Sequence, residues 1–321
     1  MTPAGEVLRD EIRRSGPIPF RRFMETALYH PEFGYYRQAR DPFGREGDFF
    51  TAEQVQPVFG ILMAALVRKL HSEMGAAGAF TVVELGAGRE EMALAFSEWR
   101  YVPVDIDRQN LPEHFDGVVF CNEFFDALAV DSAQFTAGEF REQLVSCTNG
   151  RFVWAAGGRV NDAVDDYLRR YFPEPEEGRL YEANLEALVW VERIARALDR
   201  GWVITIDYGY TRRESVRFAR GTLMGYRRHT AREDVLDDPG ERDITAHVNF
   251  SALEDHGAAC GLASNGLQTL AQTLLDAGES DKFACVLEDG IDEREQLRRR
   301  MQLKTLLFGM GETFRTLRQK K

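Results

Sequence analysis

Short apolar runs alternate with longer amphipathic segments over most of the chain from residue 80 onward. The runs that predict strands lie at 80–84, 101–105, 117–121, 202–206 and 283–288. Because these runs are nearly continuous rather than alternating, they are typical of strands buried on both faces of a sheet. The segments between them have helical periodicity, so the pattern predicts an α/β fold with a mostly parallel sheet.

Two regions depart from this alternation. Residues 131–156 contain short alternating runs, and Thr148-Asn149-Gly150-Arg151 is typical of a type I′ hairpin turn. Residues 161–199 have mainly helical periodicity. We therefore expect an accessory insertion at about 131–200, antiparallel in its first part and helical in its second, that interrupts the parallel sheet.

Residues 1–74 are expected to be mainly helical. Amphipathic patterns predict helices at 5–14, 20–29 and 57–74. Between the last two lies an aromatic, glycine-containing loop at 33–51, which is either a surface cover packed on its own rings or a lid over a binding site. The expected division is an N-terminal helical region with this loop at 1–74, and an α/β domain at 75–321.

The first predicted strand ends in Glu84 and runs into a glycine turn, Gly86-Ala87-Gly88, followed by helix-forming sequence at 90–99. A strand, a glycine turn and a helix N-terminus expose backbone N–H groups to a nucleotide-like ligand. Dinucleotide sites have a further glycine or alanine three residues after the second glycine, where this chain has Glu91. An acidic strand end before G-x-G instead favours S-adenosylmethionine. The alternative is a turn that binds no ligand.

Two acids follow the second predicted strand. A ligand with an adenosine group needs an acceptor for its ribose hydroxyls, usually a carboxylate about 20 residues after the glycine turn. Asp105 and Asp107 are the candidates, and the alternative for each is that it caps the next turn. The following strand at 117–121 begins soon afterwards, so the helix and strand that normally intervene are missing or vestigial.

The strand at 117–121 ends in polar residues, at the place where ligands lie in open α/β sheets. Glu123 and Asp126 would share a face if a helix began here, and two carboxylates can bind a guanidinium group. Alternatively, the acids only favour a helix N-terminus. Asn122-x-x-Phe125 also loosely resembles the Asn-Pro-Pro-aromatic element of amino-group methyltransferases, without its prolines.

Composition narrows the classes of function. The net charge of −12 and the pI near 5.1 argue against a general nucleic-acid binder. The four cysteines form no C-x-x-C pair, which argues against structural zinc and disulfide bonds. No run approaches the ~18 apolar residues of a membrane span, and residues 1–15 contain acids that targeting peptides lack. We expect no metal, no nucleic acid, no membrane span and a cytoplasmic location.

Several motifs together resemble the MidA family of S-adenosylmethionine-dependent methyltransferases. In the α/β part these are Glu84-Leu85-Gly86-x-Gly88, Asn122-Glu123-Phe124-Phe125-Asp126-Ala127 and Ile206-Asp207-Tyr208-Gly209. The N-terminal motifs are Leu28-Tyr29-His30-Pro31-x-Phe33-Gly34-Tyr35-Tyr36 and Gly47-Asp48-Phe49-x-Thr51. The C-terminal motifs are Gly221-Thr222-Leu223 with Tyr226 and His229, Asp238-Pro239-Gly240-Glu241-x-Asp243-Ile244-Thr245-Ala246-His247-Val248, and Met310-Gly311-Glu312. The resemblance covers nearly the whole chain.

The resemblance implies a class I methyltransferase (Rossmann-like) fold with extra helical and antiparallel segments, and S-adenosylmethionine as the cofactor. The expected cofactor-binding residues are Glu84, Gly86, Gly88, Asp105, Asp107, Asn122 and Thr51. The expected catalytic residues are Glu123 and Asp126, as a guanidinium clamp, and His247, as a base or an anchor for a substrate loop. The family's mitochondrial member methylates an arginine of a respiratory complex I subunit. A protein substrate is therefore implied, and complex I is a partner by analogy only.

The chain departs from the family pattern in three places. Glu90 replaces the family's third glycine, Thr51-Ala52-Glu53-Gln54 replaces a Thr-Ser-Pro-Glu run, and the connection at 106–117 is short. All three touch the expected pocket. The main expectation is a methyltransferase that modifies nitrogen of a protein side chain, most simply arginine, with a small molecule or a glutamine amide as other acceptors. The alternative is an assembly or scaffolding factor with weak or no activity.

Overall fold

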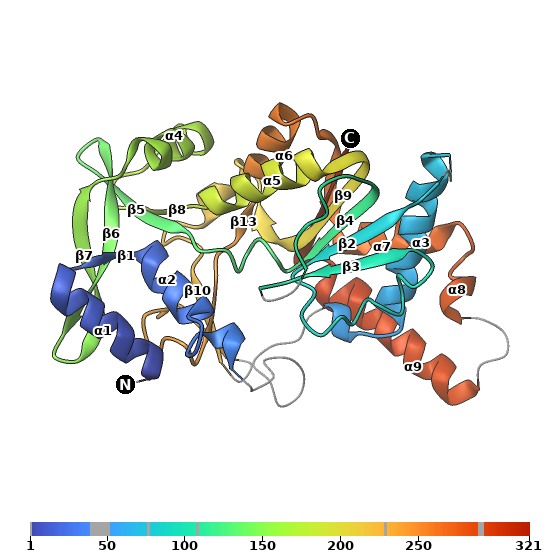
Figure 1. Cartoon of the computed structure of the whole chain (residues 1–321), viewed down its shortest axis with the longest axis horizontal. Coiled ribbons are helices and arrows are strands. Elements are labelled where there is room, and N and C mark those ends of the chain that lie inside the picture. The colour runs from blue at the N-terminus through green and yellow to red at the C-terminus, as the bar shows by residue number, and fades with distance from the viewer. Residues whose placement is uncertain (1, 39–51, 76–77, 107–108, 228–229, 288–291) are drawn as a thin grey trace. The chain divides into compact units, whose positions relative to one another are not determined.

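The structure, a computed structural model, describes residues 2–38, 52–75, 78–106, 109–227, 230–287 and 292–321 (Figure 1). Contacts between residues divide the chain into two compact units. The accessory unit comprises residues 1–50, 126–188 and 210–251, and the sheet unit comprises 51–125, 189–209 and 252–321. The sequence predicts boundaries at residue 74 and around 131–200, whereas these contacts group residues 1–50 with most of the insertion and residues 51–74 with the sheet.

The sheet unit is built on a mostly parallel sheet. Its strand order is β14 (Ala263–Thr269), β15 (Phe314–Lys320), β9 (Leu198–Tyr210), β4 (Phe115–Asn122), β2 (Thr81–Leu85) and β3 (Arg100–Val104). The last four strands are parallel, and they confirm the strands predicted at 80–84, 101–105, 117–121 and 202–206. Strand β15 runs antiparallel to β9, and β14 antiparallel to β15. The predicted fold class is thereby confirmed.

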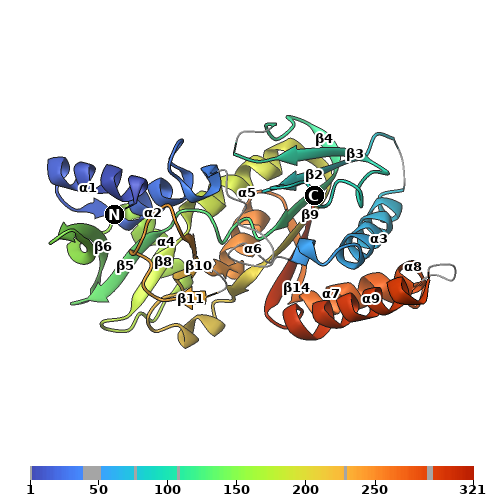
Figure 2. The ribbon, with the colours of Figure 1, turned by 90° about the horizontal axis from the view of Figure 1, so that it is seen from below.

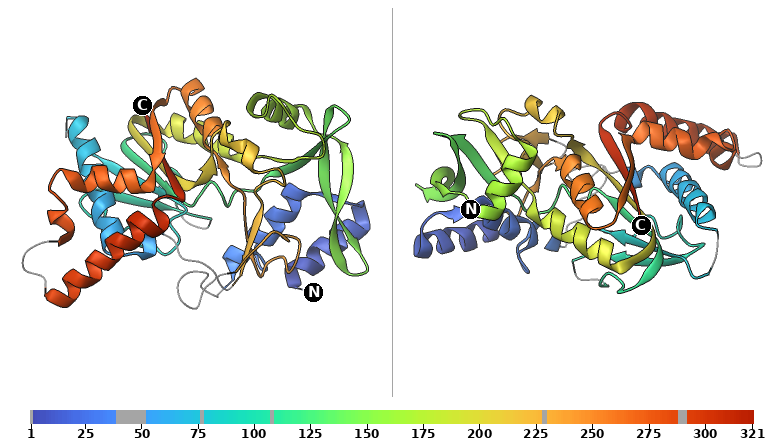
Figure 3. Two further views of the ribbon diagram at one scale, coloured as in Figure 1. Left: turned by 180° about the vertical axis from the view of Figure 1, so that it is seen from behind. Right: turned by 90° about the horizontal axis from the view of Figure 1, so that it is seen from above.

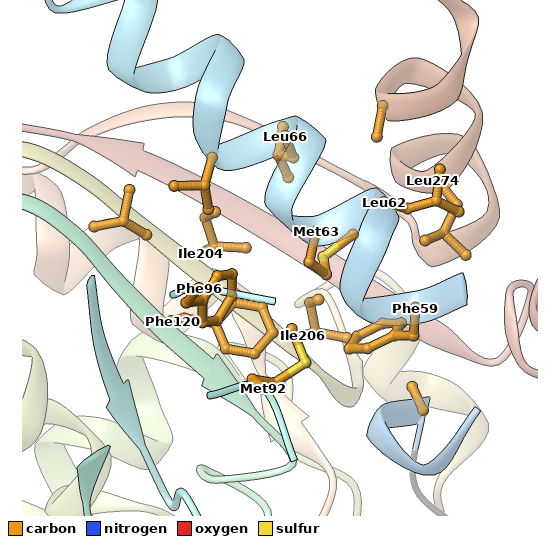
Figure 4. Close-up of a cluster of buried hydrophobic side chains, with 14 of the residues drawn as sticks. Phe59, Leu62, Met63, Leu66, Met92, Phe96, Phe120, Ile204, Ile206 and Leu274 are labelled. Atoms are coloured by element: carbon orange, nitrogen blue, oxygen red, sulfur yellow. The ribbon is translucent and has the colours of Figure 1, made fainter. Parts of the chain in front are cut away.

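Helices of the sheet unit pack together beside this sheet. They are α3 (Val58–Glu73), α7 (Leu270–Glu279), α8 (Ala284–Leu287) and α9 (Glu293–Lys304), which continues into a π-helical segment, η4 (Thr305–Met310). Figure 2 shows α3 beside α7, α8 and α9. The apolar side of α3 contributes Phe59, Leu62, Met63 and Leu66 to a core that also contains side chains from β4 and β9 (Figure 4).

Two predictions for the C-terminal part are wrong. Within the run at 283–288, residues 284–287 form helix α8 rather than a strand, because a short apolar run fits one buried helical face as well as a strand and Val286 is fully buried. The basic residues at 315–321 predict a solvated tail, but residues 314–320 form strand β15, in which Phe314, Thr316 and Leu317 are buried. The edge of the sheet is thus formed by the antiparallel pair of β14 and β15, which are separated in the chain by α7, α8, α9 and η4.

The helix predicted at 90–99 is also absent. Residues 88–98 form successive turns, in which Ala93 donates its N–H to the Glu90 carbonyl oxygen at 3.0 Å. Gly88 and Glu90 have positive φ values of 47° and 58°, in the left-handed region that a right-handed helix cannot include. The segment is held instead by Met92 and Phe96, which are buried in the core (Figure 4). No helix N-terminus therefore faces the glycine turn.

The accessory unit contains helices α1 (Pro3–Ser15), α2 (Phe20–Tyr29) and α4 (Asp162–Tyr171), and two antiparallel sheets. The larger sheet has β1 (Ile18–Pro19), β6 (Glu139–Thr148), β5 (Asp131–Thr136) and β8 (Leu180–Ala183) in that order, with β7 (Arg151–Arg159) on β6. The smaller has β11 (Thr230–Arg232), β10 (Met224–Arg227) and β12 (Asp243–Thr245). Figure 3 shows these elements from two further sides.

The antiparallel insertion predicted from the alternating pattern is confirmed. Strands β6 and β7 are joined through Asn149 and Gly150, whose φ values of 50° and 77° are those of the predicted type I′ turn. The helical expectation for 161–199 holds for α4 and α5 (Leu185–Ala197), with β8 between them. Further elements are β13 (Val248–Asn249), α6 (Phe250–Ala259), η1 (Tyr35–Arg37), η2 (Ala52–Gln54) and η3 (Glu214–Arg217). None of the helices in the described part of the chain has both the length and the apolar surface needed to cross a membrane.

Candidate cofactor site

The register of the parallel strands brings several predicted residues to one edge of the sheet. Leu85, the last residue of β2, pairs with Val104 of β3 and with Cys121 of β4. The residues that follow each strand therefore lie at the same, carboxyl-terminal edge (Figure 1). This edge carries six of the expected site residues, all in the sheet unit: Glu84, Gly86, Gly88, Asp105, Asn122 and Glu123.

The glycine turn and the acid after β3 form one hydrogen-bonded structure. The N–H groups of Gly86 and Ala87 donate to the Val104 carbonyl oxygen at 2.9 and 3.3 Å. The N–H of Gly88 donates to Asp105 Oδ2 at 2.6 Å, and Asp105 Oδ1 accepts from the N–H of Ile106 at 2.7 Å. The carboxylate of Asp105 is thus fixed against the turn, and each oxygen keeps a further acceptor direction for a hydroxyl donor.

Buried carboxyl groups surround the end of β2. Glu84 is only 1% exposed, and Tyr101 of β3 donates its hydroxyl to Glu84 Oε2. Burial raises the pKa of Glu84 to about 7, although the hydrogen bond from Tyr101 opposes the shift. Glu53, in η2, is buried nearby, and burial together with repulsion from Glu84 and Glu123 raises its pKa well above the usual range. Burial and mutual repulsion therefore favour the protonated, neutral form of these two carboxyl groups.

Glu123 is held in an unusual backbone conformation at the end of β4. Its φ of 51° lies in the left-handed region, which is costly for a glutamate, and its N–H donates to the Ile206 carbonyl oxygen at 2.9 Å. Its Oε1 accepts from the side chain of Asn122 at 3.2 Å and from the N–H of Ala52 at 3.4 Å. The carboxylate is therefore oriented by neighbouring groups at the sheet edge.

The geometric argument that paired Glu123 with Asp126 is wrong, because no helix begins at this point. The residues after β4 form bends and turns, and the fully buried Asp207 holds them by accepting the N–H of Phe125 at 3.1 Å. Asp126 belongs to the accessory unit, where its carbonyl oxygen accepts the N–H of Ala246 at 2.9 Å. The catalytic roles of the two acids stay predictions.

His247 also lies in the accessory unit. Its N–H donates to Thr222 Oγ1 at 3.0 Å, and its ring packs edge-to-face on Phe218, with centroids 5.1 Å apart. Burial lowers the pKa of the imidazole, so the neutral form is favoured. A neutral imidazole can accept a proton, as the predicted role as a base requires. Thr51 and Asp107 fall outside the described residues, as does His229 of the sequence motif.

Three residues of this edge were not singled out from the sequence as site residues. The Tyr101 hydroxyl donates to Glu84, and the carboxyl group of Glu53 repels that of Glu84. Asp207 fixes the loop after β4 by accepting the N–H of Phe125. Asp207 follows an apolar strand, which is the same signal that identified Glu84. Glu53 lies in a loop-like segment, and no periodicity distinguishes it. In the described ranges no group of three or more His, Cys, Asp or Glu side chains is arranged to hold a metal ion.

An aromatic group lies over the glycine turn. A Cβ atom placed on Gly86 would lie 3.1 Å from Cδ2 of Phe124. The Phe124 ring packs edge-on against Phe125 and Trp190, with centroids 5.2 and 5.1 Å apart. An aromatic surface beside bare backbone and a fixed carboxylate suits a ligand with a purine ring and hydroxyl groups.

We expect Glu84→Gln to change the pH dependence of stability. The pKa of Glu84 is raised from 4.5 to about 7, so the folded state holds this proton more tightly than the unfolded state. The resulting stabilisation is complete below the unfolded pKa and is lost as the pH rises through about 7. Glutamine does not ionise, so the unfolding free energy of the variant should rise relative to the natural chain as the pH increases across this window. Urea denaturation at a series of pH values measures the difference.

Glu98 provides the control for this experiment. A hydrogen bond from Arg68 lowers the pKa of Glu98, which therefore stays ionised above pH 4.5 in both states. Glu98→Gln should thus change stability by the same amount at every pH in the window. Parallel stability curves for Glu84→Gln and the natural chain would contradict the raised pKa of Glu84.

The parallel sheet, its glycine turn and the acid after the second parallel strand are those of a class I methyltransferase. A sequence profile described as “Putative S-adenosyl-L-methionine-dependent methyltransferase” matches residues 96–268. The chain belongs to this family, which includes the MidA proteins and the mitochondrial NDUFAF7 proteins. The predicted family and the predicted cofactor, S-adenosylmethionine, are confirmed.

Individual relatives are similar to this chain over most of its length. The protein arginine methyltransferase NDUFAF7 homolog of Drosophila melanogaster, a mitochondrial protein, is 28% identical over 81% of this chain and 72% of its own length. The NDUFAF7 protein of Bos taurus is 27% identical over 99% of this chain and 83% of its own. A crystal structure of a Burkholderia thailandensis protein bound to S-adenosyl-homocysteine has a TM-score of 0.89 and 31% identity, covering 99% of this chain and 92% of that one.

Proposed function

We propose that this chain transfers the methyl group of S-adenosylmethionine to a side-chain nitrogen of a protein, and that the side chain is arginine. The observation that carries the proposal is the Glu123 carboxyl group at the carboxyl edge of the sheet, which is oriented by Asn122 and by the N–H of Ala52. The guanidinium of arginine is a cation with several N–H donors, so an oriented carboxyl group suits it as a hydrogen-bond acceptor. The similarity to protein arginine methyltransferases supports arginine as the acceptor.

The described residues fit the cofactor. Gly86 leaves the turn without a side chain, and the Asp105 carboxylate is fixed by the N–H groups of Gly88 and Ile106 to accept ribose hydroxyls. The carboxyl groups of Glu84 and Glu53 supply hydrogen-bond acceptors for the amino group. When bound, the cofactor supplies an electrophilic methyl group on a positively charged sulfur.

The chain's task is to position the acceptor and to remove a proton. A new bond forms between the methyl carbon and a guanidinium nitrogen, the carbon–sulfur bond breaks, and the nitrogen loses a proton. In the proposal, Glu123 accepts hydrogen bonds from the guanidinium and takes this proton, because its carboxylate is oriented by Asn122 and by the N–H of Ala52. Asp126 and His247 are proposed as further catalytic residues of the accessory unit.

Radiolabelled methyl transfer tests the proposal. The purified chain is incubated with labelled S-adenosylmethionine and a cell lysate, and the labelled residue is identified by mass spectrometry. We expect the label on arginine of a protein. Glu123→Gln should lower transfer by about a hundredfold or more, as expected for loss of an acid–base group, while cofactor binding measured by calorimetry is kept. Glu98→Gln, an exposed glutamate paired with Arg68, is the matched control and should transfer at the natural rate.

Other outcomes would contradict specific parts of the proposal. Label only on lipid, nucleic acid or a metabolite would refute a protein substrate. Label on a lysine or glutamine would refute arginine. Cofactor binding without transfer to any acceptor would favour the scaffolding alternative, for which Glu90 in its left-handed conformation at the turn is the relevant departure.

A further inference from the structure

Helix α9 and the π-helical segment η4 carry an exposed apolar stripe. Leu297, Met301 and Phe308 are 61%, 57% and 78% exposed. Leu297 and Met301 are four residues apart, about one helical turn, so they share one side of α9, and Phe308 follows in the π-helical segment. Large apolar side chains that are exposed in a row, rather than singly, indicate an interaction surface.

The opposite side of the same segment anchors it to the sheet unit. Leu306 is fully buried, and Leu303 and Leu307 pack against the core that contains α3. Arg299 donates to Glu295 at 3.0 Å and to the Val286 carbonyl oxygen at 3.2 Å. Figure 1 shows α9 beside α3 and α7 in the sheet unit. The stripe is therefore presented by a fixed helix, and its exposure does not come from a frayed end.

Cationic side chains flank the stripe. Arg294 and Arg300 lie three residues before and after Leu297, and Lys304 lies three residues after Met301, so each neighbours the stripe on the helix surface. All three are exposed, and no ion pair joins them to another residue in the described part of the chain. Residues 293–304 contain five basic and two acidic residues, a local charge of +3 in a chain of net charge −12.

We propose that α9 and η4 form a docking surface for an anionic lipid bilayer. An apolar stripe with cations on both sides is the arrangement that lies in a membrane interface, where the apolar side chains enter the acyl region and the long basic side chains reach anionic headgroups. The chain as a whole has a net charge of −12, so such a membrane would attract it locally, through basic segments such as this one.

An acidic protein groove is the competing occupant. The stripe is three side chains long and has cations along both sides, whereas a helix that binds a protein groove buries a wider apolar face. Three unpaired cations next to a narrow stripe match a continuous layer of negative headgroups better than a single groove. The lipid assignment follows from this match of charge and width, and it is independent of the proposed methyl transfer.

Vesicle co-sedimentation of the full chain tests the inference. The chain is mixed with vesicles of phosphatidylcholine alone, or of phosphatidylcholine with phosphatidylglycerol. We expect binding to the anionic vesicles, weakened by added salt. Replacing the three apolar residues by serine should reduce this binding by about tenfold or more. The charge variant Arg294→Gln, Arg300→Gln, Lys304→Gln should reduce it by about a hundredfold.

Val216→Ser is the matched control, because Val216 is 67% exposed in η3 of the accessory unit. Its vesicle binding should equal that of the natural chain. All the substituted side chains are exposed, so circular dichroism and cofactor binding should not change. Absence of binding to anionic vesicles, equal binding to neutral ones, or unchanged binding of either triple variant would overturn the proposal. Self-association that is lost in the apolar variant, without vesicle binding, would assign the surface to a protein partner.

Discussion

Gly117→Ala should strongly destabilise the sheet unit. Gly117 lies in β4, between Thr81 of β2 and Gly201 of β9 in the strand register. Its φ is 156°, and a Cβ atom there would lie 1.9 Å from the Thr81 carbonyl oxygen. This neighbour is backbone in a central strand, so it cannot move aside without breaking the ladder between β2 and β4.

The expected cost is large for a single methyl group. Overpacking of a core commonly costs 1–3 kcal/mol, and a contact with backbone lies at the upper end or beyond, so we expect about 3 kcal/mol or more. That is a large fraction of the ~5–15 kcal/mol that stabilises a domain. Gly201→Ala should behave alike, because its Cβ would lie 1.9 Å from the Gly117 carbonyl oxygen. Soluble yield and urea denaturation measure the effect.

Gly158→Ala is the control for both variants. Gly158 is also a strand glycine, in β7, but nothing lies within 4 Å of the position of its Cβ. Its stability should stay within about 0.5 kcal/mol of the natural chain, as for ordinary surface substitutions. If Gly117→Ala and Gly158→Ala unfolded at the same urea concentration, the close approach of β2, β4 and β9 in the structure would be wrong.

The parallel strands could be predicted because their burial is uniform. Val82 and Val83 of β2, and Val118 and Val119 of β4, are all fully buried, and a continuous apolar run reports that environment directly. The hairpin at Asn149 and Gly150 could be predicted because its turn needs two positive φ values, which few residue pairs allow.

Strand β15 could not be predicted in the same way. It carries Arg315, Arg318 and Lys320, and this charge predicts a tail. Buried residues lie between the charged ones, as in an antiparallel strand with one buried face. What decides its structure is pairing with β9 and β14, which are distant in sequence. The absent helix at 90–99 has a similar cause, because the propensity of its residues is overridden by the left-handed turn at Gly88 and Glu90.

The residues expected at the sheet edge could be placed there from the sequence where they end or directly follow a buried strand. Glu84, Asp105 and Asn122 end or follow β2, β3 and β4, and parallel pairing brings such positions together. The contacts between them were not predictable, since the hydrogen bond from Gly88 to Asp105 depends on the exact path of the turn. The helix assumed at Glu123 and Asp126 is absent, because Asp207 shapes this loop through Phe125, and the roles of the two acids stay predictions.

Gly86→Val should abolish binding of S-adenosylmethionine. Gly86 has a φ of 74°, a conformation that costs a β-branched residue at least about 1–2 kcal/mol. Its Cβ would lie 3.1 Å from the Phe124 ring, and the two methyl groups of valine would extend further into the space above the turn. The Phe124 ring packs on Phe125 and Trp190, which restricts its movement away from the turn. We expect binding at least about a hundredfold weaker, equivalent to ~2.7 kcal/mol.

Gly138→Val separates loss of the site from backbone strain. Gly138 lies in the connection between β5 and β6 with a φ of 82°, and nothing lies within 4 Å of its Cβ position. Both variants carry the same side chain in a left-handed conformation, so both should lose stability, but only Gly86→Val should lose cofactor binding. Calorimetric titration measures the affinity, and the rise of the melting temperature with added S-adenosyl-homocysteine checks it, because a ligand stabilises only a chain that binds it. Natural affinity in Gly86→Val would place the cofactor elsewhere than at the Gly86–Gly88 turn, and equal loss in Gly138→Val would attribute the effect to strain.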